Sequence, residues 1–158
     1  LTRSSIPLDV THLGNISDLI IILALPNIQI LTKDARDILP REVDMKNFVG
    51  NMANACLIAS AFSTDNYKLF SRSLKDIVIE PVRSKLIPGF DEVKAVALEA
   101  GADGMTISGA GPAVFAITNA QNKAPIIEDA MTRTFQKNGI ECNTLITSPS
   151  SEGSIEIK

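Results

Sequence analysis

The sequence predicts an α+β domain whose strands and helices follow the order βαββαβ, the split-βαβ or ferredoxin-like α/β sandwich. Apolar, strand-like runs lie at 19–25, 105–118 and 140–147, and helical periodicity lies between them. A glycine-rich turn interrupts the middle run and divides it into a hairpin. We therefore expect an antiparallel sheet with helices on one face, and extra helices in the first crossover.

The composition fits one globular domain. The chain has 158 residues, of which 45% are hydrophobic and 21% charged, as expected for a packed core. The formal net charge of −3 lacks the basic excess of a nucleic-acid binder. The longest apolar run, 19–25, is far shorter than the roughly 20 residues of a membrane span. We expect no nucleic-acid partner, no membrane and a cytoplasmic location.

The first half of the chain predicts a strand followed by helices. Residues 19–25 are apolar, branched and followed by Pro26, which favours a strand buried on both faces. Thr32 precedes a short helical stretch and is a candidate N-cap. Asp44 is a candidate N-cap for a longer helix, and a weaker helical pattern covers 67–77. The longer helix has one apolar face, made of Met45, Phe48, Val49, Met52, Cys56 and Ala59.

The second half alternates helices with strands. Residues 90–100 form a helical pattern, and Gly101 suits its left-handed C-cap. Strands over 105–108 and 113–118 are joined by the glycine-rich turn. A helix over 126–135 and a strand over 140–147 follow, and Ile155 and Ile157 predict a closing edge strand. Residues 1–5 are strand-like but have no partner that we can assign.

The single histidine and the two cysteines offer little chemistry. His12 has no neighbour that would complete a Ser-His-Asp triad or a zinc site, so we expect it in a surface loop. Cys56 lies on the apolar helix face and Cys142 in a strand, so both are predicted to be buried and unreactive. We expect no metal ligands and no disulfide, in keeping with a reducing compartment.

The turn Ser108-Gly109-Ala110-Gly111-Pro112 allows two interpretations. Its backbone N–H groups could converge on an anion, with the hydroxyl of Ser108 added. It could equally be a hairpin turn that needs positive φ angles. It is not a P-loop, because no Gly-Lys-Ser or Gly-Lys-Thr follows, and it joins two strands instead of opening a helix as a dinucleotide fingerprint does.

Two arginines and a threonine form a second candidate site. Thr32 and Arg36 are four positions apart and would lie on one face of a helix, while Arg83 follows Glu80-Pro81-Val82. Arginines that converge would suit a small carboxylate, because a guanidinium bonds both oxygens at once. The alternative is a plain N-cap and two solvated charges, and spacing alone leaves both open.

Three segments, in order, resemble motifs of homoserine kinases. Residues 26–36, PNIQILTKDAR, resemble P-x-x-x-x-x-T-K-x-A-R. Residues 76–89, DIVIEPVRSKLIPG, resemble D-x-x-x-x-P-x-R-x-x-L-x-P-G. Residues 101–112, GADGMTISGAGP, resemble G-A-x-G-x-x-x-S-G-A-G-P. The resemblance covers nearly the whole chain, with departures from the usual residues at Ile79 and Ala113.

The resemblance implies a fold, a reaction and a place within a larger enzyme. Homoserine kinases belong to the GHMP kinase superfamily, two-lobed enzymes whose C-terminal lobe is a ferredoxin-like α/β sandwich. The nucleotide loop of the N-terminal lobe is absent and the chain begins with Leu1, so we expect 1–158 to be the C-terminal domain alone. The implied reaction is ATP-dependent phosphorylation of the side-chain hydroxyl of L-homoserine to O-phospho-L-homoserine, in threonine biosynthesis. ATP and Mg²⁺ would be held mainly by the N-terminal lobe, so we expect this fragment to be inactive alone.

The resemblance also implies roles for individual residues. Arg36 and Arg83 match positions that hold the homoserine carboxylate, and Thr32 matches a neighbouring polar contact. Ser108, Gly109, Ala110 and Gly111 match the third superfamily motif, which lies near the phosphates of the nucleotide. Catalytic residues are expected mainly in the N-terminal lobe. A homodimer is possible on the base rate among soluble enzymes alone, and the sequence does not determine the oligomeric state.

Two alternatives stay open. The chain could be a free-standing ferredoxin-like module that binds an amino acid as a regulator, without catalysis and without an upstream lobe. It could also belong to a kinase of the same superfamily with another acceptor, such as a diphosphocytidyl-methylerythritol or mevalonate-type kinase. Arg36 would then have no obvious purpose with an acceptor that lacks a carboxylate.

Overall fold

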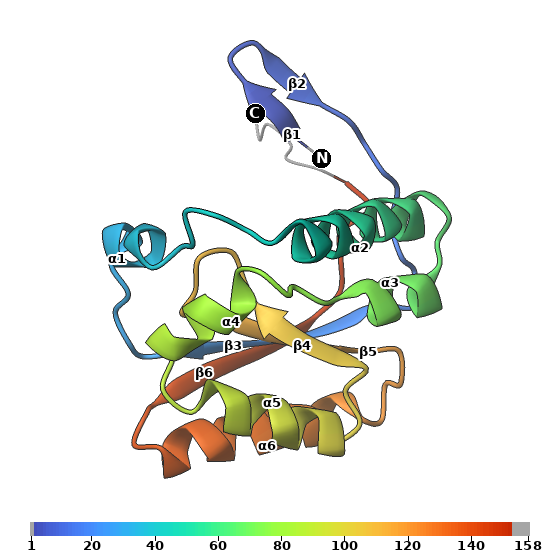
Figure 1. Ribbon diagram of the computed structural model, residues 1–158. Coiled ribbons are helices and arrows are strands. Elements are labelled where there is room, and N and C mark those ends of the chain that lie inside the picture. Colours follow the sequence, from blue (N-terminus) through green and yellow to red (C-terminus); the bar gives the residue numbers. More distant parts are fainter. Residues whose placement is uncertain (1, 153–158) are drawn as a thin grey trace, which may run out of the picture.

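The computed structural model describes residues 2–152 (Figure 1). The strands are β1 (Thr2–Ser5), β2 (Leu8–Val10), β3 (Ile20–Pro26), β4 (Gly104–Ile107), β5 (Val114–Thr118) and β6 (Cys142–Thr147). The helices are α1 (Thr32–Asp37), α2 (Met45–Ser63), α3 (Tyr67–Ser73), α4 (Glu80–Arg83), the 3₁₀ turn η1 (Ser84–Leu86), α5 (Phe90–Glu99) and α6 (Ala124–Lys137). From β3 onward this order confirms the predicted βαββαβ arrangement with extra helices in the first crossover.

Strands β3 to β6 form one antiparallel sheet in the order β4-β5-β3-β6. The register places Ile22 of β3 opposite Ala116 of β5 and Ile146 of β6. In this order β5 lies between β3 and β4, the first two strands of the repeat, which is what a split-βαβ arrangement requires. The predicted antiparallel sheet is confirmed.

Helices α5 and α6 cover one face of the sheet (Figure 1). Val93 of α5 and Phe135 of α6 are fully buried in the same cluster as Ile22. Beyond α5, Gly101 has a φ of +102°, a left-handed conformation that glycine adopts without steric cost. The chain therefore turns directly from α5 towards β4, as the sequence predicted.

Helices α2 and α3 pack against part of the opposite face. Ala61 of α2 and Phe70 of α3 are buried with Ile16 and with Ile117 of β5. The expectation of helices on one face is thus correct for α5 and α6 and wrong for the crossover helices. The physical reason lies in β3, whose consecutive isoleucines place apolar side chains on both faces of the sheet. Helices must therefore shield both faces from water.

The apolar stripe of α2 faces solvent instead of the core. Met45, Phe48, Val49 and Met52 are 72%, 50%, 57% and 51% exposed, and Cys56 is exposed too. The prediction of a buried Cys56 was therefore wrong, because periodicity shows that a helix has an apolar side but not what covers it. The predicted N-cap of α2 is confirmed, because the Asp44 side chain accepts hydrogen bonds from two amides of the first turn.

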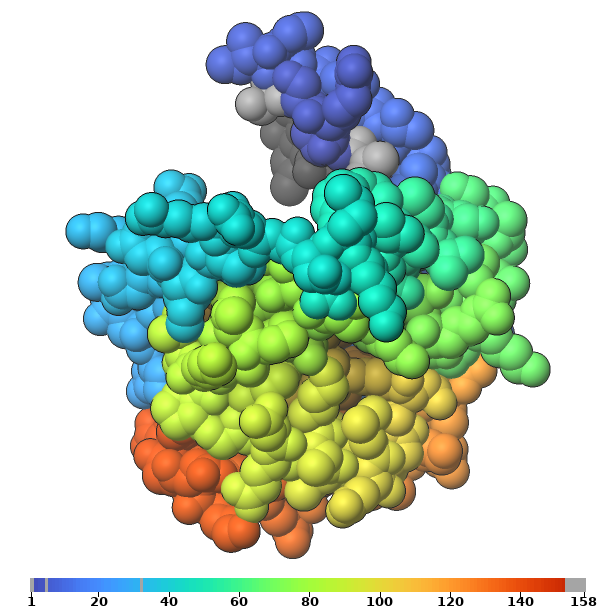
Figure 2. Space-filling model, in the orientation of Figure 1, coloured from blue at the N-terminus to red at the C-terminus, as the bar shows by residue number. Residues whose placement is uncertain are grey.

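The ends of the chain and the loops complete the comparison. β1 and β2 form a hairpin that projects from the body (Figures 1 and 2), so residues 2–5 have the partner that the sequence did not reveal. The predicted strand at Ile155 and Ile157 lies outside the described residues. His12 lies exposed in a loop, as predicted. Within residues 2–152, none of the helices has the length and apolarity needed to cross a membrane.

Candidate functional site

Helix α1 carries two of the predicted site residues, Thr32 and Arg36. The helix begins at Thr32, and the capping position is Leu31, which makes no side-chain cap, so the prediction of Thr32 as N-cap was wrong. Ala35 is buried (1% exposed) and its amide donates to the carbonyl of Leu31 at 3.0 Å. Arg36 is exposed. Helix α1 thus rests on the protein through Ala35 and leaves Arg36 accessible from solvent.

Arg83 links two segments that are far apart in the sequence. It is the last residue of α4, a helix of 4 residues with a proline in its first turn, which favours helix initiation. Its Nε donates to the carbonyl of Ala35 at 3.4 Å, and its Nη1 donates to the carbonyl of Gly109 at 3.1 Å. A guanidinium has five N–H groups, so most of them stay available to a ligand.

The glycine-rich loop is a tight turn between β4 and β5. Gly109 and Gly111 have φ angles of +59° and +84°, which confirms the prediction of positive φ. Ser108 donates its amide to the carbonyl of Ala113 at 2.8 Å and accepts from the amide of Gly111 at 3.0 Å. Gly109 and Ala110 are exposed at the tip, and their amides have no protein acceptor within residues 2–152.

These contacts bring the three predicted segments to one place. The Arg83 side chain touches α1 beside Arg36 and the loop at Gly109. Neither arginine forms an ion pair within the described part of the chain. Two guanidinium groups without acidic partners, next to exposed amides, can bind an anion such as a carboxylate or a phosphate. Across residues 2–152 no group of three His, Cys, Asp or Glu side chains could hold a metal ion.

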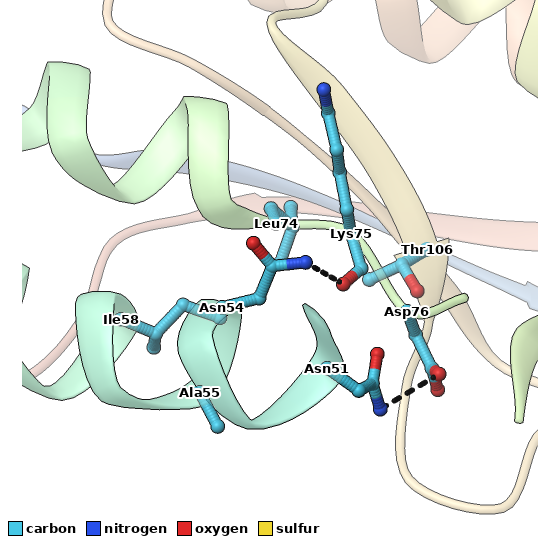
Figure 3. Close-up of a pocket in the computed structure, with 8 residues that line it drawn as sticks. All are labelled: Asn51, Asn54, Ala55, Ile58, Leu74, Lys75, Asp76 and Thr106. Atoms are coloured by element: carbon cyan, nitrogen blue, oxygen red, sulfur yellow. Dashed lines mark hydrogen bonds between the residues drawn. The ribbon is translucent and has the colours of Figure 1, made fainter. Parts of the chain in front are cut away.

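Two residues of α2 that the sequence did not single out, Asn51 and Asn54, hold the segment before α4. Asn51 of α2 donates from Nδ2 to Oδ1 of Asp76 at 3.2 Å, beside a hollow of about 200 Å³ (Figure 3). Nearby, Asn54 donates from Nδ2 to the carbonyl of Lys75 at 3.0 Å. Asp76 opens the second motif, but it gave no capping signal, because the N-cap position of α4 is Ile79, which makes no side-chain cap. Asn51 gave none, because its bond crosses 25 positions.

Comparison with known proteins identifies the family. A family model described as "GHMP kinases C terminal" matches residues 58–137. The homoserine kinase of Chloroherpeton thalassium is 39% identical over 155 residues, which are 98% of this chain and 49% of that protein. The homoserine kinase of Methanococcus maripaludis is 44% identical over 118 residues, or 74% of this chain and 38% of the relative.

A solved structure agrees with the sequence relatives. The crystal structure of homoserine kinase from Cytophaga hutchinsonii matches with a TM-score of 0.90 at 37% identity, covering 97% of this chain and 49% of that one. The chain thus spans about half the length of the relatives that it matches. The family model covers more than half of the chain, and the observed fold agrees with the solved relative. The chain belongs to the family of GHMP kinase C-terminal domains.

Proposed function

We propose that this chain is the acceptor-binding half of a homoserine kinase. The reaction transfers the γ-phosphoryl group of ATP to the side-chain hydroxyl of L-homoserine and forms O-phospho-L-homoserine, a step of threonine biosynthesis. The observation that carries the proposal is the bridge that Arg83 makes between Ala35, beside Arg36, and Gly109 of the glycine-rich loop. The relatives at 39% and 37% identity, which are homoserine kinases, support the same acceptor.

The arginines would act by holding the acceptor in place. Homoserine carries a carboxylate at one end and the reacting hydroxyl at the other, so fixing the carboxylate orients the hydroxyl. Phosphoryl transfer depends mostly on such positioning and on charge stabilisation. Arg36 has its whole guanidinium available, and Arg83 adds the N–H groups that it does not use within the protein. Thr32 belongs to the first turn of the same helix as Arg36 and is proposed as a neighbouring polar contact.

The glycine-rich loop would lie on the phosphate side of the site. Ser108, Gly109, Ala110 and Gly111 form its turn, and the exposed amides of Gly109 and Ala110 fit a phosphate oxygen. Mg²⁺ is usually held by one or two carboxylates together with substrate phosphates. We propose that ATP and Mg²⁺ are held mainly by the part of the enzyme that this chain does not span, and that the fragment alone is inactive.

The test uses the full-length polypeptide that carries this chain, with Mg-ATP and either L-homoserine or mevalonate. We expect ADP release with homoserine only. Arg36→Ala is the more informative variant, because the Arg83 guanidinium also bonds to the protein whereas the Arg36 guanidinium has no partner within residues 2–152. A charge-assisted hydrogen bond contributes about 1.5–3 kcal/mol, and Arg36 is exposed, so we expect the KM for homoserine to rise about 10-fold at unchanged melting temperature. Arg41→Ala, an exposed arginine of the next segment, is the matched control.

The other results separate an error in the acceptor or the reaction from an error in the site. ADP release with mevalonate alone would favour another acceptor in the same superfamily. Homoserine binding without any ADP release would favour a regulatory amino-acid-binding module. An unchanged KM in Arg36→Ala would remove Arg36 from the site while leaving the reaction itself in place.

A further inference from the structure

The segment between α3 and α4 is held to α2 by hydrogen bonds of two side chains, Asn51 and Asp76. Oδ1 of Asp76 accepts from Nδ2 of Asn51 at 3.2 Å and from the amides of Val78 and Ile79 at 3.0 and 2.8 Å. Oδ1 of Asn51 in turn accepts from the amide of Ile77 at 3.0 Å. Figure 3 shows the Asn51 and Asp76 side chains pointing towards one another from α2 and from the loop. Together the two side chains accept hydrogen bonds from every backbone amide from 77 to 79.

The hydrogen-bonded segment 77–79 determines where α4 begins. The amides of Val82 and Arg83 donate to the carbonyl of Ile79 at 3.1 and 3.0 Å, so Ile79 is the first acceptor of the helix. A helix of 4 residues cannot hold its own geometry, because a single turn is unfavourable in isolation. The position of α4 therefore comes from its attachments.

A second attachment holds α4 from its other side. Glu80, in the first turn of α4, forms an ion pair with Lys94 of α5. The carboxylate is largely buried, with 14% of its side chain exposed. The two attachments lie at the start of α4, and Arg83 lies at its end. A small displacement of the start is transmitted to the guanidinium, whose bonds to Ala35 and Gly109 already measure 3.4 and 3.1 Å.

We infer that Asn51 and Asp76 are positioning residues for Arg83, and through it for the carboxylate of the acceptor. The inference rests on the proposed function. Neither residue is assigned a contact with substrate, and each acts through the backbone of 77–79. Loss of the pair should weaken acceptor binding in the ground state and the transition state alike, which raises the KM without lowering kcat.

The chemistry of the pair allows a rescue experiment. In Asn51→Asp two carboxylates face one another, which is unfavourable for like charges in contact. In Asp76→Asn the new amide keeps an oxygen for the backbone amides of Val78 and Ile79, so the damage should be smaller. The double variant Asn51→Asp/Asp76→Asn removes this repulsion between like charges, because the group at position 76 is then neutral and keeps an oxygen where Oδ1 of Asp76 accepts from the amides of Val78 and Ile79. Each side chain of the double variant also keeps an oxygen for the backbone.

The experiment measures steady-state kinetics of the full-length polypeptide with homoserine varied at saturating Mg-ATP, and then with ATP varied. For Asn51→Asp we expect a homoserine KM raised about 10-fold, which corresponds to about 1.4 kcal/mol, with kcat and the KM for ATP within about 2-fold. The double variant should return the homoserine KM to within about 3-fold of the wild type. Asn47→Asp, which adds the same charge one turn earlier on α2 at an exposed position, should leave every constant unchanged.

Hydrogen exchange of the amides of 77–83 supplies a readout that does not depend on turnover. It should be faster in Asn51→Asp and restored in the double variant. A wild-type homoserine KM in Asn51→Asp would overturn the inference, as would a double variant no better than Asn51→Asp. If Asn51→Asp does not fold, Asn51→Ala takes its place: it loses both hydrogen bonds of the Asn51 side chain without adding a charge, and a wild-type homoserine KM in that variant would equally overturn the inference. Failure of the proposed function is distinct, since the wild-type enzyme itself would then release no ADP with homoserine.

Discussion

Tyr67→Phe removes a single hydroxyl from the contact between α3 and the segment that leads into β4. Tyr67 is 9% exposed, and its Oη donates to Oδ2 of Asp103 at 2.6 Å. Hydrogen bonds to charged partners contribute about 1.5–3 kcal/mol to stability. Asp103 is exposed, so water can replace the lost donor. We therefore expect the lower end, a loss of about 1.5 kcal/mol in the free energy of unfolding at pH 7.

The same contact makes stability depend on pH. Burial, followed by the hydrogen bond and the charge of Asp103, raises the pKa of Tyr67 above its ordinary value. The folded state then holds the phenolic proton more tightly than the unfolded state does. The contribution is complete below a pH of about 10, the usual pKa of tyrosine, and is lost as the pH rises above it. Above that pH, wild-type stability should fall more steeply than that of Tyr67→Phe.

The composition of the chain makes this prediction easy to measure. The sequence has 1 tyrosine and no tryptophan, so the near-ultraviolet absorbance of tyrosinate reports Tyr67 alone. Urea unfolding at neutral and alkaline pH gives the two free energies. Asp103→Asn, which keeps an acceptor but removes the charge, should lose less than Tyr67→Phe at pH 7. A loss below about 0.5 kcal/mol in Tyr67→Phe, or tyrosinate forming at the ordinary pKa in the folded chain, would refute the reasoning.

Two further predictions compare matched positions in urea unfolding and thiol labelling. Gly14→Ala should lower the free energy of unfolding more than Gly109→Ala does. Both glycines have a positive φ, which costs about 1–2 kcal/mol for alanine. In addition, a Cβ at position 14 would lie 2.7 Å from the carbonyl oxygen of Phe62, whereas a Cβ at position 109 meets nothing within 4 Å. Equal losses would contradict this. Exposed Cys56 should react quickly with a thiol reagent at neutral pH, and Cys142 should react slowly, because burial raises the pKa of the Cys142 thiol. Cys56→Ser should abolish the fast phase of labelling. Two fast phases in the wild type would contradict the partial burial of Cys142.

The fold could be predicted from the sequence because its signals are local. The apolar run of β3, the left-handed Gly101 and the hairpin turn at Gly109 each act within a few residues, and the strand order follows from their sequence. The side of the sheet that α2 covers could not be predicted, since an amphipathic period is the same whether the stripe meets a core or solvent.

The candidate site, too, could be predicted from the sequence only in part. Arg36 and Arg83 were found through motifs, but their neighbourhood depends on the carbonyls of Ala35 and Gly109, which are backbone atoms without any sequence signature. The Asn51–Asp76 bond spans 25 positions, and no spacing rule connects residues at that distance. Sequence thus located the charged groups, and only the tertiary structure shows what positions them.

The exposed stripe on α2 also has a practical consequence for anyone who handles this polypeptide. Met45, Phe48, Val49 and Met52 are half or more exposed, so exchanging them for polar residues should cost less folding free energy than a substitution in the core. Contiguous apolar surface nevertheless promotes self-association and precipitation. Phe48→Lys and Met52→Glu are accordingly the first changes to make for a well-behaved sample in concentrated solution, and both leave the amide of Asn51 available for its bond to Asp76.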